Sequence, residues 1–311
     1  MRRLAALFAG LLFWAGVAAA QDCPSVPLPG SAQLKKLEAE ATDRGMLWRI
    51  RRDGHESYLY GSIHIGRPAW LFPGPALREA WARTEVLALE LDPFDPQTLQ
   101  ALRSLPDLAL DLRNERRLQA QIQAACLTEQ QLAGLHPLLK LATLASLSGR
   151  GDGLDPGYSQ EMALLGRARG EGRAVHALES AAEQMAALVP ADEATARREL
   201  ALGLDQLEKG RVRPLLLGLA EAWERGDLAA LTRLEPPCRC ADDEVEKLQL
   251  QRLNEGRNDA LARRIAELHA SGKRAFVAVG ALHMSGSKAL PDLLRQQGFE
   301  VEALLPKPRQ P

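Results

Sequence analysis

Two related stretches decide the fold of this chain, YLYGSIHIG at residues 58–66 and FVAVGALHMSG at residues 276–286. Each begins as an apolar run typical of a buried strand and continues into Gly-x-x-His. Glycine lets the backbone turn sharply and lets a ligand approach closely. Because open α/β sheets bind ligands at the carboxyl ends of their strands, we expect His64 and His283 to lie at such an edge.

The flanking sequence predicts how the rest of the domain is built. Two short strands at residues 47–51 and 57–60, separated by the turn pair Asp53-Gly54, predict a β-hairpin. Strands alternate with helices at both ends of the chain, while residues 96–172 and 181–250 are mainly helical. We therefore predict an α/β (mixed α+β) domain over residues 47–305, with a central β-sheet, strand-end Gly-x-x-His motifs, flanking helices and a helical middle insert. Further strands are expected at residues 85–91, 174–179, 274–279 and 299–305, and helices at 75–84, 158–169, 258–270 and 291–297.

The N-terminus has the pattern of an export signal. A basic start at Arg2 and Arg3 precedes an apolar run and three small residues, which predicts a signal peptide over residues 1–20 cleaved between Ala20 and Gln21. The alternative is an uncleaved anchor, but the run is short for a bilayer span of about 20 residues. We expect a periplasmic or secreted protein with no integral membrane segment after cleavage, an N-terminal arm over 21–46 and a C-terminal tail over 306–311.

Four cysteines remain after the predicted cleavage: Cys23, Cys126, Cys238 and Cys240. An even number in an oxidising compartment favours disulfides. A bond between Cys238 and Cys240 would close a very tight ring. Each of them is therefore expected to pair with Cys23 or Cys126, tying the arm to the helical middle. The alternative is a thiolate metal site, although C-x-C without a second pair is a poor zinc signature.

Composition excludes several classes of protein. Apolar residues make up 46% of the 311 and charged residues 25%, which is typical of a globular protein. The formal net charge of −1 gives no basic footprint, so nucleic acid is not expected as a partner.

The repeated motif suggests a metal site. A neutral imidazole is a good ligand for zinc, cobalt or manganese. One Gly-x-x-His occurs often by chance, but two copies at strand ends, with Glu90 closing another apolar strand, indicate a shared site. A carboxylate at that position is costly unless it meets a metal, a cation or a donor. The alternative is that Glu90 caps a helix or pairs with an arginine and that both histidines are hydrogen-bonded turn residues.

The order of these segments resembles the TraB/PrgY/GumN family, which includes the TIKI-type proteases and is more distantly similar to the erythromycin-esterase and ChaN-like proteins. The resemblance rests on GSIH ending at His64, VLALELD at residues 86–92, LES at 178–180, Arg257-Asn258 heading a helix, and VAVGALH ending at His283. It covers roughly residues 47–305. It implies a metal-dependent hydrolase, a peptidase acting on a peptide or protein substrate with manganese or cobalt.

The resemblance also implies roles for individual residues. His64 and His283 would be metal ligands, and Glu90 either a third ligand or the base that deprotonates water at the metal. Arg257 would hold a substrate carboxylate or the developing oxyanion, or would form a fork that locks Glu90 or Glu179. Glu179 would hydrogen-bond the residues around the metal without binding the metal itself.

One segment departs from the family pattern. Ser159 stands where the family usually has an acidic residue, and Asp155 or Glu161 could take its place. The alternative function is a noncatalytic periplasmic protein that binds a peptide, a metal or a polysaccharide precursor on the same fold.

Overall fold

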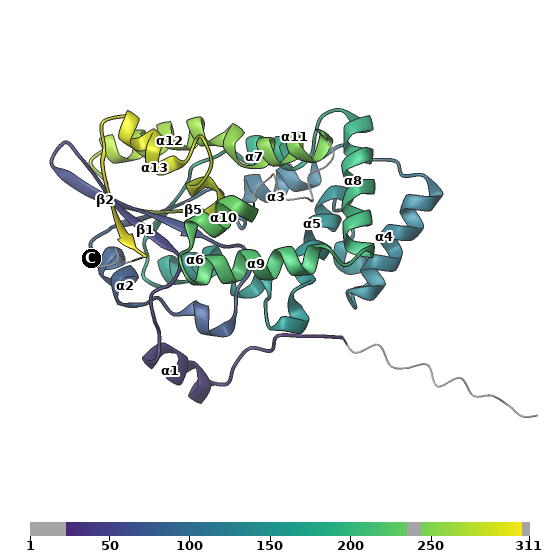
Figure 1. Cartoon of the computed structure of the whole chain (residues 1–311), viewed down its shortest axis with the longest axis horizontal. Helices are drawn as coiled ribbons and strands as arrows, with labels where there is room; N and C mark the ends of the chain where they lie inside the picture. The colour runs from purple at the N-terminus through teal and green to yellow at the C-terminus, as the bar shows by residue number, and fades with distance from the viewer. Residues whose placement is uncertain (1–22, 235–243, 307–311) are drawn as a thin grey trace, which may run out of the picture.

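One six-stranded mixed sheet organises residues 23–234 and 244–306, the part of the chain that the computed structural model describes (Figure 1). The strand order is β4-β3-β5-β2-β1-β6. Helices cover the sheet on two sides, which confirms the predicted mixed α/β class. The strands are β1 (Met46–Arg52), β2 (His55–Ser62), β3 (Val86–Leu89), β4 (Ala174–Ala177), β5 (Ala275–Gly280) and β6 (Glu300–Leu305).

The predicted hairpin is present. Strands β1 and β2 pair antiparallel, with Arg52 opposite His55 at the turn. Asp53 and Gly54 both have positive φ, 52° and 84°. A two-residue turn that follows the right-handed strand twist requires this conformation at both positions. The hairpin therefore has the register that Asp53-Gly54 predicted, and β6 adds to its outer edge, antiparallel to β1.

The other strand pairs are parallel and place the two motifs side by side. Strand β5 pairs with β2 from Tyr58 opposite Phe276 to Ser62 opposite Gly280. On its other side β5 pairs with β3, which in turn pairs with β4. Four adjacent strands thus end at the same edge of the sheet, and both Gly-x-x-His segments leave from it.

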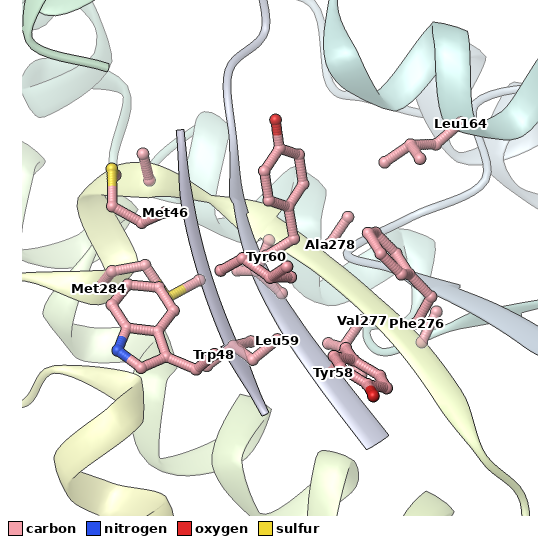
Figure 2. Packing of buried hydrophobic residues seen from close by; sticks show 14 of the residues in the cluster. Met46, Trp48, Tyr58, Leu59, Tyr60, Leu164, Phe276, Val277, Ala278 and Met284 are labelled. Atoms are coloured by element: carbon pink, nitrogen blue, oxygen red, sulfur yellow. The ribbon is translucent and has the colours of Figure 1, made fainter. Parts of the chain in front are cut away.

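The core lies on both faces of this parallel region. All six residues of β5 are buried, and the ring of Phe276 lies 5.9 Å from that of Tyr60 on β2. Figure 2 shows Tyr58, Tyr60, Phe276 and Val277 packed along the two neighbouring strands. Full burial of Val277 and its neighbours explains why this strand reads as a continuous apolar run.

Helices α12 and α13 lie on one side of the sheet, and α2 and α6 on the other (Figure 1). The middle helices α4, α5, α7 and α8 enclose a second hydrophobic cluster, as the predicted helical insert requires. The α-helices are α1 (Ser31–Ala39), α2 (Pro75–Ala82), α3 (Pro96–Arg103), α4 (Leu112–Ala124), α5 (Pro137–Leu147), α6 (Gln160–Gly170), α7 (Ala181–Leu188), α8 (Glu193–Glu208), α9 (Val212–Glu224), α10 (Leu228–Leu234), α11 (Glu244–Leu253), α12 (Glu255–Ala270) and α13 (Leu290–Gln296). Short 3-10 turns are η1 (Pro68–Leu71), η2 (Glu129–Leu132), η3 (Arg150–Asp152), η4 (Pro156–Tyr158) and η5 (Ala281–Met284).

Helix α9 is anchored directly to the first motif. The fully buried indole of Trp223 donates a hydrogen bond from Nε1 to the carbonyl of Gly61, at 2.8 Å. The Trp223 carbonyl accepts a hydrogen bond from the Gly45 amide just before β1. The helical part and the sheet edge are thereby fixed to each other.

The disulfide joins Cys23 to Cys126, with Cα atoms 5.6 Å apart. The expectation that Cys238 and Cys240 would each pair with one of these two residues was wrong, because a cysteine forms a single disulfide and these two are joined to each other. The predicted link between arm and helical middle is present, since Cys126 follows α4. Cys238 and Cys240 lie outside the described residues.

The predicted signal peptide, its cleavage site and most of the C-terminal tail also lie outside the described residues. Within residues 23–234 and 244–306, none of the helices combines the length and apolar character needed to cross a membrane.

The disulfide is expected to stabilise the fold. It closes a loop with a sequence separation of 103 residues, so the double variant Cys23→Ser/Cys126→Ser should lose about 2–5 kcal/mol of unfolding free energy in urea denaturation. As a control, peptide mapping of a Cys238→Ser/Cys240→Ser protein without reduction should still give the Cys23–Cys126 linked peptide. A wild-type map that links Cys23 or Cys126 to Cys238 or Cys240 would contradict the structure.

Candidate functional site

Each of the four parallel strands delivers one predicted site residue to the same edge. Glu90 directly follows β3, and Glu179 lies two residues beyond β4. Their backbones remain adjacent, since the Glu179 amide donates to the Glu90 carbonyl at 2.9 Å. His64 follows β2, and His283 lies in the 3-10 turn after β5. Sheet order thus brings together residues that are far apart in sequence.

Three of these side chains converge on Gly280. A Cβ atom placed on Gly280 would lie 3.3 Å from Glu90 Oε1, 3.6 Å from His283 Cδ2 and 3.6 Å from His64 Nε2. The two rings are therefore well within the distance of about 10 Å beyond which a shared mononuclear site is excluded. The glycine of the second motif leaves open the space that the three side chains face.

The glycines of the first motif allow close packing. A Cβ on Gly61 would lie 3.4 Å from Ala281 Cα in the second motif. A Cβ on Gly66 would lie 1.9 Å from the Tyr158 carbonyl oxygen, a distance that no side chain tolerates. Gly66 and Asp155 exchange backbone hydrogen bonds at this contact. The loop that carries His64 can therefore lie against the segment before α6 only with glycine at position 66.

Glu90 is buried and held by three donors. Its Oε1 accepts from the Gly280 amide at 2.7 Å, and its Oε2 accepts from Arg257 Nη2 at 2.5 Å and from Gln184 Nε2 at 3.3 Å. Burial alone would raise the pKa of this carboxyl. The effects of His283, Arg257 and His64 and the Gly280 hydrogen bond outweigh burial and lower the pKa to about 2. Glu90 is therefore a carboxylate throughout the physiological range.

Arg257, in the first turn of α12, forms a fork between two glutamates. Its Nε donates to Glu179 Oε1 at 2.9 Å, and its Nη2 donates to both Glu179 Oε2 and Glu90 Oε2. Its Nη1 donates to the Leu253 carbonyl. Burial disfavours the charged form, but the two carboxylates outweigh burial and raise the pKa of Arg257. Arg257 thus pairs with both Glu90 and Glu179, whereas the sequence predicted a pair with one of the two.

Asn258 sets the protonation of His283. The Asn258 amide nitrogen donates to the carbonyls of His283 and Lys288, so its Oδ1 faces His283 Nδ1 at 2.5 Å. Nδ1 must then carry the proton. Burial, aided by Arg257 and His64 and opposed by Glu90, lowers the pKa of His283 to about 4. His283 is thus neutral, with its Nε2 lone pair 4.0 Å from Glu90 Oε2 and 3.4 Å from Arg257 Nη1.

Glu161 is the acidic residue that reaches His64. Its Oε1 lies 3.2 Å from His64 Nδ1, and the Glu161 carboxylate raises the pKa of the imidazole. The His64 side chain is 69% exposed, whereas Glu161 is 18% exposed. Burial raises the pKa of the Glu161 carboxyl, but the His64 imidazole and the hydroxyl of the nearby Ser62 outweigh burial and lower it.

Ser159 and Asp155 contact neither histidine in this arrangement. The Ser159 hydroxyl caps α6 by accepting from the Met162 amide. Asp155 pairs with Arg150 and accepts from the Gly157 amide. Ser159 fixes the helix that carries Glu161, and the Asp155 backbone fixes the loop that carries His64.

A cavity of about 470 Å³ opens above these residues. Its floor contains His64, Glu90, Arg257 and His283. Its walls come from helices α5, α7, α9, α10 and α11, so the helical insert covers the edge of the sheet at which the four parallel strands end. A concave site with apolar walls and a few convergent polar groups is typical of ligand binding.

Sequence reasoning assigned no role to Asn258 or Gln184. Both are uncharged residues in the first turns of helices, and such residues are common there for capping alone. The only signal was position: Asn258 follows Arg257, and Gln184 lies one turn beyond Ser180 at the start of α7.

The imidazole nitrogen and carboxylate oxygen atoms near Gly280 are of the chemical types that bind divalent metals. Each histidine has Nδ1 next to an oxygen acceptor, and the His64 Nε2 faces the point that Glu90 also faces. Histidine ligands in metal sites are oriented in this way by a partner on the other nitrogen. In the described part of the chain, no three His, Cys, Asp or Glu side chains are already arranged closely enough to hold an ion together. Glu90 brings a carboxylate to this point, and its oxygens already accept hydrogen bonds from Gly280, Arg257 and Gln184.

Fold and site together define an α/β protein with a strand-end His, His and Glu constellation. Residues 46–303 match the sequence profile of the TraB/PrgY/gumN family, and the chain belongs to this family. The resemblance inferred from the ordered motifs is thereby confirmed.

Three curated relatives are named Metalloprotease TIKI1. The human protein is 24% identical over 88% of this chain and 65% of its own length. The Danio rerio protein is 25% identical over 82% and 62%, and the Xenopus tropicalis protein is 24% identical over 87% and 64%. This chain therefore spans less than two thirds of the length of these relatives. No solved structure gives a significant match.

The Arg257 fork is expected to be essential for folding stability. Arg257→Leu would leave Glu90 and Glu179 buried without a counter-charge, since their side chains are 9% and 4% exposed. The free energy of unfolding should fall by about 3–5 kcal/mol in chemical denaturation. The control is Arg263→Leu on the same helix, whose pair with Glu267 is exposed on both sides and should cost less than about 1 kcal/mol. Equal losses in the two variants would argue against a special role for the fork.

Proposed function

We propose that this chain is an exported, metal-dependent peptidase. The observation that carries the proposal is the convergence of both Gly-x-x-His imidazoles and Glu90 at Gly280, on the floor of a cavity. The similarity to proteins named as metalloproteases supports the same reaction class. Export is supported by the basic and apolar pattern of residues 1–20 and by the disulfide, since disulfides persist outside the cytoplasm.

His64, His283 and Glu90 would hold the metal, which is manganese, cobalt or zinc in this proposal. A divalent metal at this place supplies Lewis acidity that polarises a peptide carbonyl and makes water more acidic. His283 presents its Nε2 because Asn258 holds the proton on Nδ1. Glu161 orients His64 from the other side.

Glu90 is better suited to hold the metal than to act as a base. Both of its oxygens already accept hydrogen bonds, from Gly280, Arg257 and Gln184. These donors fix the carboxylate beside the imidazoles, and Oε1, which accepts one hydrogen bond, keeps a lone pair for the metal. Arg257 is likewise engaged by Glu90 and Glu179, so its contribution in this proposal is to position Glu90 next to the imidazoles.

A noncatalytic binding protein on the same fold is the alternative. One observation favours it: Arg257 Nη1 lies 3.4 Å from His283 Nε2, where a positive charge opposes binding of a cation. Such a protein would bind its peptide, metal or polysaccharide precursor in the same cavity. It would keep its ligand when Glu90 is replaced by glutamine, whereas a peptidase would lose turnover.

Metal content tests the proposal directly. Elemental analysis of the mature protein, loaded separately with manganese, cobalt and zinc, should find about one ion per chain. His64→Ala and His283→Ala should each abolish this binding, because each removes one imidazole ligand. The matched control is His176→Ala on β4, whose ring lies beside Lys273 and should leave the stoichiometry unchanged. Failure of all three metals to bind the wild type would refute the metal-dependent proposal.

A second test concerns Asn258. Asn258→Leu removes the acceptor for His283 Nδ1 and frees the ring to change tautomer, so metal affinity measured by calorimetry should fall about 10–100-fold. Gln184→Leu removes a longer hydrogen bond to Glu90 and should have a smaller effect. A metal affinity unchanged in the Asn258 variant would contradict the proposal that Asn258 prepares His283 as a ligand.

A further inference from the structure

The cavity above the site has one continuous aliphatic wall. Val212, Leu215, Leu216 and Leu219 line it from α9. Their spacing places them on one face of the helix. Leu188 of α7 and Leu253 of α11 line the cavity as well. All six side chains keep part of their surface exposed, so an apolar helix face is directed at an open cavity as well as at the protein core.

The charges in the cavity are confined to its floor. Of the described residues that line it, the charged ones are Glu90 and Arg257, next to His64 and His283. Arg257 is paired with Glu90 and Glu179. Ser146, Gln184 and Asn254 add uncharged polar groups to the lining, but a charged substrate side chain that entered between the aliphatic helices would lose its hydration and gain no countercharge from these described residues.

From these observations we infer that the α9 wall selects peptides with a large apolar side chain, leucine or phenylalanine, beside the bond to be cleaved. This inference rests on the proposed peptidase function and adds the substrate class. Apolar contact between that side chain and the wall removes surface of both from water, which is favourable by about 25 cal/mol per Å². The backbone on either side of the selected residue would then lie over the polar floor.

Leu215 is the residue best placed to test the wall. It lines the cavity but belongs to neither hydrophobic cluster of the core, unlike Leu216 and Leu219, which pack against the main cluster. Leu215→Lys puts a positive charge into the wall at little cost to the core. Glu221→Lys is the matched control, because it adds a positive charge on the exposed face of the same helix.

The substrates are capped pentapeptides, acetyl-Gly-Gly-X-Gly-Gly-amide, in which X is Leu, Phe, Glu or Lys. The wild type, loaded with metal, should cleave the Leu and Phe peptides with kcat/KM at least about tenfold higher than the Glu and Lys peptides. Leu215→Lys should lower kcat/KM for Leu and Phe and raise the relative value for Glu, while Glu221→Lys keeps the wild-type order. If Leu215→Lys does not fold by circular dichroism, Leu215→Ala replaces it and should reduce the preference for Leu over Glu.

Binding of the same unlabelled peptides, measured by calorimetry, separates the inference from the proposed function. Tighter binding of Leu and Phe peptides without any cleavage would support the apolar wall and overturn the peptidase. Cleavage with equal kcat/KM for all four peptides, or an order that Leu215→Lys and Leu215→Ala leave unchanged, would overturn the inference and leave the peptidase standing. Neither binding nor cleavage of any peptide would overturn both.

Discussion

The buried guanidinium of Arg257 is the interaction on which the site depends. It joins Glu179 after β4 to Glu90 after β3, and Glu90 in turn accepts the Gly280 amide at the end of β5. One cation from α12 thereby holds together the ends of three parallel strands. Two buried carboxylates at neighbouring strand ends would repel each other without it. The histidines are placed around this fixed charge, and the helical insert covers it with cavity-lining side chains that, among the described residues, are uncharged.

Much of the fold can be predicted from local sequence patterns. Asp53-Gly54 predicts the hairpin because only a primed turn matches the strand twist, and the buried parallel strand β5 appears as an uninterrupted apolar run. The disulfide partners of Cys23 and Cys126 were assigned wrongly, because spacing along the chain constrains only the closest pairs. Two cysteines about a hundred residues apart carry no local sign that they meet.

The sequence indicates which candidate residues lie at strand ends but not what they contact. Periodicity indicates that His64, Glu90 and His283 follow strands, whereas the order of those strands depends on long-range packing, so their convergence on Gly280 required the structure. The same limit applies to Arg257, for which the sequence left several partners open, and to Asn258, whose contacts with His283 and with the Lys288 carbonyl required the structure. Polar residues at helix starts look alike until the opposite group is known.

The position of β5 in the sheet has a consequence for synthesis. This strand lies between β3 and β2 yet is the fifth of six along the chain. While the ribosome is still making the helical insert, the β1–β2 hairpin and the β3–β4 pair have no strand to join them. Residue 283 is also made after the other residues of the candidate site, from His64 to Gly280. A chain that stops before β5 therefore lacks the second imidazole, the central strand and the Gly280 floor together, although His64, Glu90 and Glu179 have already been made.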